Sequence, residues 1–265
     1  MSRIKKCVIP AAGMGKRLYP LTRGQPKEML PILNKPVIHY VVDEAIRSGV
    51  DEILMVVGAG KEAIINYFDR HKMDDELDAN GEYNFPDIYF VRQKEQKGLA
   101  DAISYARNFT GDEDFLVLLG DTIYRSDDSL TVTSHLLKTY HRIAKPLIAL
   151  EEIPYDDVMN YGIIGGEETE PGIVRINKFV EKPNKMDAPS NLGITGIYIL
   201  QNEIYDFIEV TKPGKNGELQ LTDSLGMMLK NQEIYGERIN GKRYDIGSLD
   251  LWIRTFITFA KEKGY

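Results

Sequence analysis

The chain has 265 residues and a formal net charge of −7, with 33 Lys and Arg against 40 Asp and Glu. This acidic balance and the lack of a basic run exclude a nucleic-acid backbone as the expected main partner. No apolar stretch approaches the ~20 residues of a membrane-spanning helix, and Met1–Lys6 carries no secretory pattern, so we expect a cytoplasmic protein with no membrane partner. The single cysteine, Cys7, lies in an apolar run and is expected in the core of a protein kept in a reducing compartment.

The first half of the chain alternates short apolar runs with helical patterns. Alternating strands and helices of this length imply right-handed crossovers and a mostly parallel sheet, so the expected fold class is α/β with a doubly wound sheet. We predict strands at Cys7–Ala12, Ile53–Val57, Ile88–Val91 and Phe115–Leu119, and helices at Pro36–Ser48, Lys61–Arg70 and Leu99–Asn108.

The second half is richer in strand patterns, which we expect to extend the same sheet and to cover the site. The polar segment His71–Asp87 is interpreted as a surface insertion. In the last predicted helix, Leu251, Phe256, Ile257 and Phe259 favour packing in a core or an interface. Strands are predicted at Leu147–Glu151, Gly162–Gly165, Ile173–Glu181 and Thr195–Leu200, and helices near Glu203–Glu209, Leu219–Lys230 and Leu249–Glu262.

A glycine-rich turn, Gly13-Met14-Gly15-Lys16-Arg17, follows the first predicted strand. Glycines let a ligand approach the backbone, and the exposed N–H groups form an anion site. The turn is not the dinucleotide fingerprint, because Leu18 stands where the third glycine would be, and it lacks the Gly-Lys-Ser/Thr of a P-loop. Arg17 and Lys27, ten positions apart, can clamp a triphosphate; the alternative is a tight turn with two solvated surface charges.

Asp121 directly follows the apolar strand Phe115–Leu119. A carboxylate at the carboxyl end of a buried parallel strand points into the crevice where α/β sheets bind ligands. Mg²⁺ takes few protein ligands and completes its shell with water and phosphate oxygens, so two aspartates suffice. The alternative is an ordinary turn residue after Gly120. The four histidines lack metal-site spacing and are expected to be ordinary residues.

The turn and the segment Pro26–Pro31 together resemble the sugar-1-phosphate nucleotidyltransferases, and are most similar to the bacterial-type UTP–glucose-1-phosphate uridylyltransferases (UDP-glucose pyrophosphorylases). Further matching segments follow in order and extend the resemblance over nearly the whole chain. They are Arg92-Gln93, Lys97–Ala102, Leu119–Asp121, Asn160–Gly162, Val180–Pro183, Ser190–Gly193, Gly217–Asp223 and Tyr244–Gly247.

The resemblance implies a role for each matching residue. The implied catalytic residues are Arg17, Lys27, Asp121 and Lys182, and the implied Mg²⁺ ligands are Asp121 and Asp245. The implied nucleotide-binding residues are Ala11, Ala12, Gly13, Gly15, Arg17, Lys27, Gln93 and Gly98. The implied sugar-phosphate-binding residues are Gly162, Glu181, Lys182 and Asn191.

Composition alone gives plainer interpretations of several of these residues. Gln93 lies in a highly polar loop that is typical of a solvated surface, and Glu181-Lys182-Pro183 is unremarkable at a strand end. Asp245 precedes a glycine, as aspartates in turns often do. The chain departs from the family at Lys16, where a threonine is usual. It is also shorter than the usual bacterial enzyme, and we expect the missing residues near His71–Asp87.

The resemblance implies one Rossmann-like domain over residues 1–265, with a nucleotide half to about residue 125 and a β-rich sugar-binding half from about residue 126. The implied reaction joins UTP to glucose 1-phosphate with Mg²⁺ and releases pyrophosphate, in a homo-oligomer. Three alternatives stay open: a thymidylyltransferase that uses dTTP, a non-catalytic regulatory homologue, and a glycosyltransferase. The last would carry an Asp-x-Asp metal motif, and the only one, Asp112-Glu113-Asp114, precedes its strand instead of following it.

Overall fold

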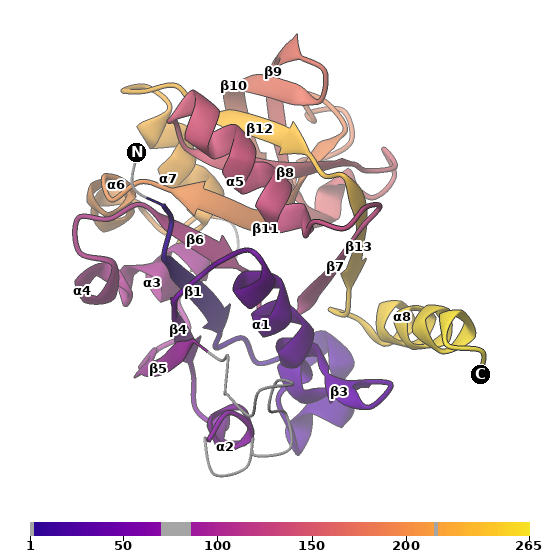
Figure 1. Ribbon diagram of the computed structural model, residues 1–265. Helices are drawn as coiled ribbons and strands as arrows, with labels where there is room; N and C mark the ends of the chain where they lie inside the picture. The colour runs from indigo at the N-terminus through magenta and orange to yellow at the C-terminus, as the bar shows by residue number, and fades with distance from the viewer. Residues whose placement is uncertain (1–2, 70–85, 215–216) are drawn as a thin grey trace.

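The computed structural model describes residues 3–69, 86–214 and 217–265. Nine strands form one mixed sheet in the order β5-β4-β1-β6-β11-β8-β12-β10-β9 (Figure 1). Their bounds are β1 Lys6–Ala11, β4 Glu52–Val57, β5 Asp87–Arg92, β6 Phe115–Leu118, β8 Leu147–Glu152, β9 Gly162–Glu170, β10 Ile173–Glu181, β11 Leu192–Leu200 and β12 Tyr235–Arg238.

The strands β5, β4, β1 and β6 are all parallel, and the α/β fold class is confirmed. Beyond β6 the sheet is mixed, because β11 runs antiparallel to both β6 and β8, and only β8 and β12 pair in parallel. The expectation of a mostly parallel sheet therefore holds for the first half only. The short turn Pro171-Gly172 between β9 and β10 allows only antiparallel pairing, since parallel neighbours need a long crossover.

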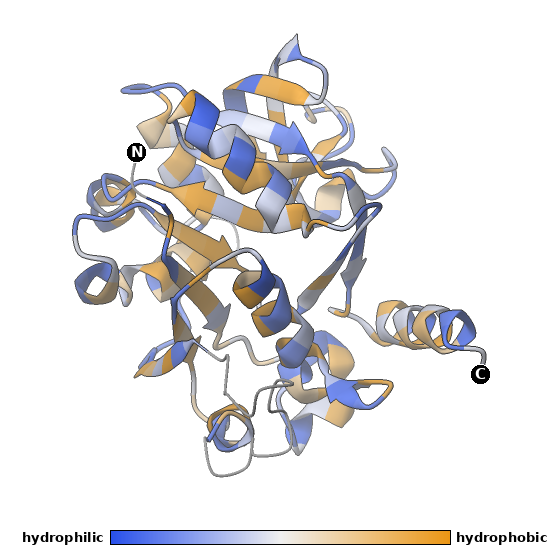
Figure 2. Cartoon of the chain, viewed as in Figure 1, coloured by the Kyte–Doolittle hydropathy of each residue, from blue (hydrophilic) through white to orange (hydrophobic). Residues whose placement is uncertain are grey.

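Helices cover both faces of the sheet. On one face α1 (Val37–Arg47) and α5 (Val132–Ile143) pack on alternate strand residues such as Cys7 and Ile9. On the other face α3 (Leu99–Ser104), α6 (Ile204–Val210) and α7 (Leu221–Met228) pack on the intervening residues, such as Val8. Figure 2 shows the hydrophobic residues concentrated on the strands and on the inner sides of these helices. Because both faces are buried, the strands read as continuous apolar runs.

Most predicted elements of the first half are confirmed within a few residues. The predicted helix Leu99–Asn108 is instead two short helices, α3 and α4 (Arg107–Thr110). The predicted helix at Lys61–Arg70 is α2 (Glu62–Tyr67). Most of the insertion expected at His71–Asp87 lies outside the described residues.

Several elements were not predicted from the sequence. They include helix α5, strand β12, the short strands β2 (Pro31–Ile32) and β3 (Lys35–Pro36), and a two-stranded antiparallel ribbon of β7 (Thr122–Ser126) and β13 (Gly241–Asp245). In the ribbon, Thr122 lies opposite Asp245. The ribbon leaves the main sheet and leads to the C-terminal helix α8 (Leu249–Glu262), which extends away from the body (Figure 1).

Helix α8 packs on the rest of the chain through one side only. Phe259 is 1% exposed in a small core with Ile32, Val37, Ile123 and Ile246, and Phe256 packs against that core. Core packing is therefore confirmed for these two phenylalanines. Leu251 and Ile257, also expected in a core or an interface, are 37% and 46% exposed on the described chain.

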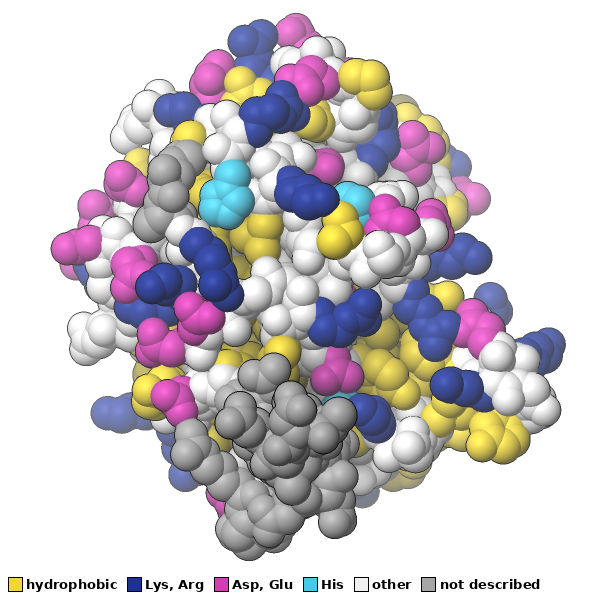
Figure 3. Space-filling view, viewed as in Figure 1, with side chains coloured by type: hydrophobic (Ala, Val, Ile, Leu, Met, Phe, Trp, Pro, Cys, Tyr) yellow, Lys and Arg dark blue, Asp and Glu magenta, His cyan; other side chains and the backbone are white. Residues whose placement is uncertain are grey.

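The described surface fits the charge balance of the sequence. On the face shown in Figure 3, Lys and Arg side chains alternate with Asp and Glu side chains and form no single basic surface. Within residues 3–69, 86–214 and 217–265, no helix is long and apolar enough to cross a membrane. Cys7 is buried as a free thiol, as predicted, and burial raises its pKa well above the usual range.

Candidate active site

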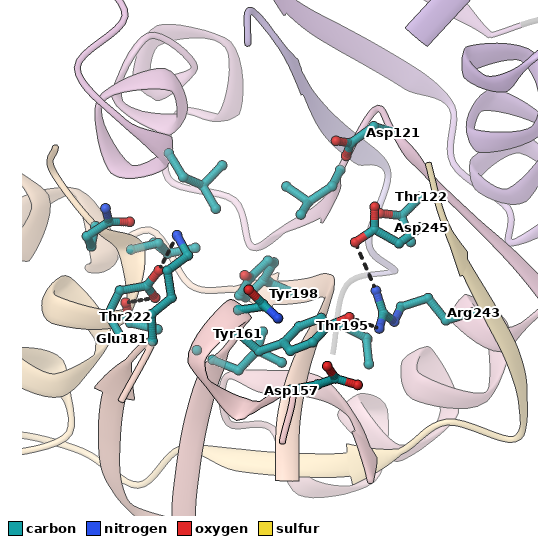
Figure 4. A pocket seen from close by; sticks show the side chains of 18 of the residues that line it. Asp121, Thr122, Asp157, Tyr161, Glu181, Thr195, Tyr198, Thr222, Arg243 and Asp245 are labelled. Atoms are coloured by element: carbon teal, nitrogen blue, oxygen red, sulfur yellow. Dashed lines mark hydrogen bonds and ion pairs between the residues drawn. The ribbon is translucent and has the colours of Figure 1, made fainter. Parts of the chain in front are cut away.

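A cavity of about 560 Å³ opens at the carboxyl edge of the parallel strands, between the two halves of the chain (Figure 4). Six of the sequence-predicted site residues line it, although they come from distant parts of the chain. They are Arg17, Asp121, Gly162, Glu181, Lys182 and Asp245.

The glycine-rich turn after β1 lies beside Lys27. Gly15 has φ +64°, a left-handed conformation that glycine adopts readily, and its carbonyl accepts a 2.8 Å hydrogen bond from Thr22 Oγ1. A side chain added at Gly13 would lie 3.5 Å from Lys27 Nζ. The turn therefore delivers Arg17 to the cavity and leaves the backbone at Gly13 open beside a lysine.

Lys27 and Asp121 form an ion pair, with side chains 17% and 18% exposed. Burial alone would lower the pKa of Lys27, but the charges of Asp121 and Glu28 outweigh it and raise the pKa to about 12. Burial would likewise raise the pKa of Asp121, but the charge and hydrogen bond of Lys27 hold it below the usual range. Both groups are therefore charged at neutral pH, as a site for a phosphate and a cation requires.

A second ion pair, which the sequence analysis did not identify, lies directly behind the first. Lys61 Nζ donates to Glu28 Oε2 at 2.6 Å, and the two residues are 4% and 1% exposed. Burial raises the pKa of Glu28 although the charges of Lys27 and Lys61 oppose it. Glu28 directly precedes the apolar stretch Met29-Leu30-Pro31, and a charged residue that borders such a stretch was the available signal that it is buried and paired.

Asp121 directly precedes β7, and Asp245 is the last residue of β13. Because these two strands pair, with Thr122 opposite Asp245, the two aspartates lie next to each other. The amide of Ile246 donates to the carbonyl of Asp121 at 3.3 Å. One carboxylate oxygen of Asp245 accepts the amide of Gly247 at 2.6 Å. A side chain at Gly247 would lie 2.8 Å from both Asp245 Oδ1 and Arg17 Nη2, so this turn also packs against Arg17.

The donor set fits a hard divalent cation with few protein ligands. Asp121 and Asp245 supply carboxylate oxygens from adjacent backbone segments, and Figure 4 shows both side chains on the same side of the cavity. Mg²⁺ keeps several waters and binds phosphate oxygens, so it does not need a third carboxylate. Across the described ranges no group of three or more His, Cys, Asp or Glu forms a closed metal site.

Arg243 was also missed from the sequence. It donates to Glu151 Oε2 at 2.8 Å, to the Tyr161 hydroxyl at 3.1 Å and to Asp245 Oδ2 at 3.4 Å. Its guanidinium also lies 5.0 Å from the Tyr161 ring centre. Arg243 therefore ties the carboxylate end of the cavity to the segment before β9. Arg243 stands two residues before Asp245, and residues two apart on a strand lie on the same face. This spacing was the available signal that Arg243 belongs to the site.

The other end of the cavity carries Glu181 and Lys182. Lys182 Nζ lies 2.9 Å from Glu181 Oε1, and Thr222 donates to Glu181 Oε2 at 2.8 Å (Figure 4). Adjacent strand residues normally point to opposite faces, but Lys182 has φ +46°, which turns the chain before Pro183. Gly162 leaves room there, because a side chain would meet Thr222 Cγ2 at 2.7 Å.

Gln93, Gly98 and Asn191 do not line this cavity. Gln93 is 3% exposed and donates to Asp101 Oδ2 at 2.6 Å. A side chain at Gly98 would lie 2.5 Å from the Leu219 carbonyl, so this glycine is needed for close packing of two loops. Asn191 is partly buried, and its carbonyl accepts the amide of Ile153 at 2.8 Å. Their ligand roles stay predictions.

The α/β sheet, the glycine turn with its cations and the paired aspartates are features of proteins that bind phosphate-bearing ligands with a divalent cation. The chain belongs to the nucleotidyl transferase family, whose sequence pattern matches residues 6–261. Enzymes of this family generally use a divalent metal ion.

Similar proteins cover nearly the full chain. A protein of Methanocaldococcus jannaschii, provisionally named UTP–glucose-1-phosphate uridylyltransferase, is 45% identical over 98% of this chain and 94% of its own. The UTP–glucose-1-phosphate uridylyltransferase of Staphylococcus epidermidis is 41% identical over 98% and 93%. A crystal structure of UDP-glucose pyrophosphorylase complexed with UDP-glucose has a TM-score of 0.91 at 39% identity, over 98% of this chain and 99% of that one.

Proposed function

We propose that the chain is an enzyme that makes UDP-glucose and pyrophosphate from UTP and glucose 1-phosphate. The observation that carries this proposal is one cavity with charged groups at two ends: Arg17, Asp121 and Asp245 line one end, and Glu181 and Lys182 line the other. Lys27 does not line the cavity but pairs with Asp121. Such a cavity suits two anionic substrates that must meet. Relatives that carry the name of this activity match the chain over nearly its whole length.

The reaction is an in-line displacement at the α-phosphorus. An oxygen of the sugar phosphate forms a bond to the α-phosphorus, and the bond from that phosphorus to the oxygen that bridges the α- and β-phosphates breaks, so that this oxygen leaves with pyrophosphate. The attacking oxygen is already ionised near neutral pH, so no general base is needed. The protein contributes positioning and charge neutralisation between two anions.

In this proposal each cation has a separate partner. Arg17 holds the leaving pyrophosphate, Lys27 contacts the triphosphate and Lys182 contacts the incoming phosphate. Glu181 accepts hydrogen bonds from sugar hydroxyls, and its second oxygen is already fixed by Thr222. Two further residues complete the proposed sugar subsite. Gly162 lets the sugar approach the backbone closely, and Asn191 lies near the sugar.

Asp121 and Asp245 would hold the divalent cation, which we propose is Mg²⁺. When bound, such an ion neutralises charge on the α-phosphate and orients its oxygens. The chain supports this arrangement because Arg243 and the Gly247 amide fix the Asp245 carboxylate. Lys27 then serves as a partner shared between Asp121 and the phosphates.

The base is proposed to lie against the main chain of the first turn and the loop after β5. Gln93 reads its polar edge, and Gly98 allows close approach. The residues that complete this nucleotide site are Ala11, Ala12, Gly13 and Gly15. Gln96 supports this arrangement, because its Nε2 donates to the Ala12 carbonyl at 2.6 Å and holds the two loops together.

The nucleotide half is proposed to end near residue 125 and the sugar half to begin near residue 126, within one domain. We also propose a cytoplasmic location and a homo-oligomer. The surface that fits a second copy is the solvent side of α8, where Leu249, Ile253 and Ile257 are 48%, 43% and 46% exposed. Light scattering of Ile253→Lys and Ile257→Lys tests this assembly, and an unchanged mass would contradict that surface.

A substrate panel tests the proposed function. Pyrophosphate release is measured with UTP, dTTP, CTP, ATP and GTP, each against glucose, galactose and N-acetylglucosamine 1-phosphate. The highest kcat/KM is expected for UTP with glucose 1-phosphate. A preference for dTTP would make the chain a thymidylyltransferase. No release from any pair, with Asp121→Asn equally inactive, would indicate a non-catalytic homologue.

A further inference from the structure

The buried amide of Gln93 is held from one end. Gln93 follows β5, its backbone N–H donates to the Val57 carbonyl at 2.8 Å, and its side chain is 3% exposed. Its Nε2 donates to Asp101 Oδ2, in the first turn of α3, at 2.6 Å. Backbone and side chain are therefore both anchored.

This hydrogen bond has only one chemically allowed direction. An ionised carboxylate has acceptors only, whereas an amide has a donor end and an acceptor end. Rotating the Gln93 amide by half a turn would place its oxygen against a carboxylate oxygen at hydrogen-bond distance. Within the described chain, Gln93 Oε1 receives no hydrogen bond from the protein. The amide thus presents a fixed, unused acceptor.

The position of Gln93 connects this acceptor with the site. Val57 lies between Ala11 and Arg92 in the register of β1, β4 and β5, so Gln93 leaves the sheet at the same edge as the first turn. Two nearby residues, Leu99 at the start of α3 and Glu218 in the loop before α7, line the cavity itself.

We propose that Asp101 is a positioning residue that fixes the Gln93 amide so that its oxygen meets the base, and thereby selects nucleotides with an N3–H donor. This inference rests on the proposed base site at Gln93. Asp101 itself need not touch the nucleotide.

The hydrogen-bonding groups on the base edges explain why UTP and dTTP should be favoured over CTP. Uracil and thymine carry a hydrogen on N3 between two carbonyls, so an acceptor opposite N3 and a neighbouring N–H donor match them. Cytosine has a lone pair on N3 beside an amino group and matches only the reversed amide. A site that fixes its polar groups rejects the mismatched ligand because those groups stay unpaired. Asp101 blocks the reversal that CTP would require.

The experiment compares UTP with CTP in Asp101→Asn. An asparagine can face the Gln93 amide with either end, so the amide is no longer fixed. Calorimetry of nucleotide binding without sugar phosphate, and kcat/KM with it, give the UTP-to-CTP preference. We expect this preference to fall about tenfold or more in Asp101→Asn, the size expected for one mismatched hydrogen bond.

Two further variants separate positioning from a merely structural role. Ser104→Ala removes the hydrogen bond of Ser104 Oγ to the Asp101 carbonyl at 2.7 Å, which belongs to the same helical turn, and should leave the preference unchanged. In the double variant Gln93→Glu, Asp101→Asn, the asparagine amide donates to the glutamate, which is the reverse of the wild-type hydrogen bond. The other glutamate oxygen still offers an acceptor to the base. This double variant should restore preference for UTP relative to Asp101→Asn.

Equal losses for UTP and CTP in Asp101→Asn, or an unchanged preference, would overturn the inference. The proposed function fails separately, if the wild type releases no pyrophosphate from UTP with any sugar phosphate. The calorimetric preference still tests Asp101 in that case, because it needs binding alone.

Discussion

Lys27 and Asp121 lie 94 positions apart in the chain and form an ion pair at the carboxyl edge of the sheet. Strands β1 and β6 are parallel neighbours, so the segments that follow them leave the sheet at the same edge. The pair therefore joins the glycine-rich turn to the carboxylate proposed to hold the metal ion. The first two predictions depend on this contact.

Replacing Asp121 by asparagine should reduce kcat by ~10²-fold or more, if its electrostatic contribution is worth ~2.7 kcal/mol. Asparagine keeps the volume and can still accept a hydrogen bond from Lys27, so the unfolding temperature should change little. Asp245→Asn should behave in the same way. Turnover is measured by pyrophosphate release at saturating Mg²⁺, and near-wild-type turnover of Asp121→Asn would remove Asp121 from the proposed metal site.

The pH dependence of nucleotide binding should change in Asp121→Asn. The wild-type pKa of Lys27 is raised to about 12, so this lysine stays charged throughout the neutral and mildly alkaline range. The variant loses the Asp121 charge, which opposes the effect of burial, so the pKa of Lys27 should be lower than in the wild type. Nucleotide affinity should therefore decline at a lower pH in the variant than in the wild type.

Calorimetry from neutral to alkaline pH, without added divalent ion, measures this decline without the contribution of a lost metal ligand. The control is Asp121→Asn with Lys27→Arg, because arginine stays charged over that range. If nucleotide affinity declines over the same pH range in the wild type and in Asp121→Asn, the ion pair does not set the charge of Lys27.

Gly162→Ala should damage the sugar subsite. The added methyl group would lie 2.7 Å from Thr222 Cγ2 and 3.2 Å from Glu181 Oε2. Overpacking costs roughly 1–3 kcal/mol, so kcat/KM for the sugar phosphate should fall about tenfold.

Thr222→Ser is the matched second change, because serine lacks the obstructing methyl but keeps the hydroxyl that donates to Glu181 at 2.8 Å. The double variant should recover part of the lost kcat/KM. A double variant no better than Gly162→Ala would show that the Thr222 contact is not the cause of the loss.

The elements of the first half were predictable because their strands are buried on both faces and alternate with amphipathic helices. Ribbon β7–β13 was not, since its residues, such as Lys242 and Arg243, carry charge and its partner strands lie more than 100 positions apart in the chain. Helix α5 begins at a Thr131 cap, whose side chain accepts the amide of Ser134, but its sequence Val132-Thr133-Ser134 resembles a strand start. In both segments, tertiary packing and not local sequence preference determines the secondary structure.

Of the site, the sequence indicated residues that follow strands or glycines, such as Asp121 and Arg17. It did not indicate side chains that act on those residues. Glu28, Lys61 and Arg243 are recognised only when the fold brings their partners together, because the Lys61–Glu28 and Arg243–Glu151 contacts join residues far apart in the sequence. Asp101 likewise needs the observed hydrogen bond to Gln93.

The last prediction separates the roles of Lys27 and Lys182. Lys27 lies beside the glycine turn, whereas Lys182 is paired with Glu181 at the opposite end. Lys27→Ala should weaken nucleotide binding measured by calorimetry without sugar. Lys182→Ala should leave that binding nearly unchanged and raise the KM for the sugar 1-phosphate or lower kcat. Charge-assisted hydrogen bonds run ~1.5–3 kcal/mol, so each effect should be about tenfold or greater.

Backbone geometry supplies a control for Lys182. Because its φ is +46°, Lys182→Gly removes the same ammonium group but suits the left-handed conformation better than alanine does. Both variants should lose sugar-phosphate binding equally, while Lys182→Gly retains the higher unfolding temperature. Lys16→Thr, at the exposed position where the family has threonine, should keep full activity. If Lys182→Ala weakens nucleotide binding as much as Lys27→Ala does, the cavity does not consist of two separate subsites.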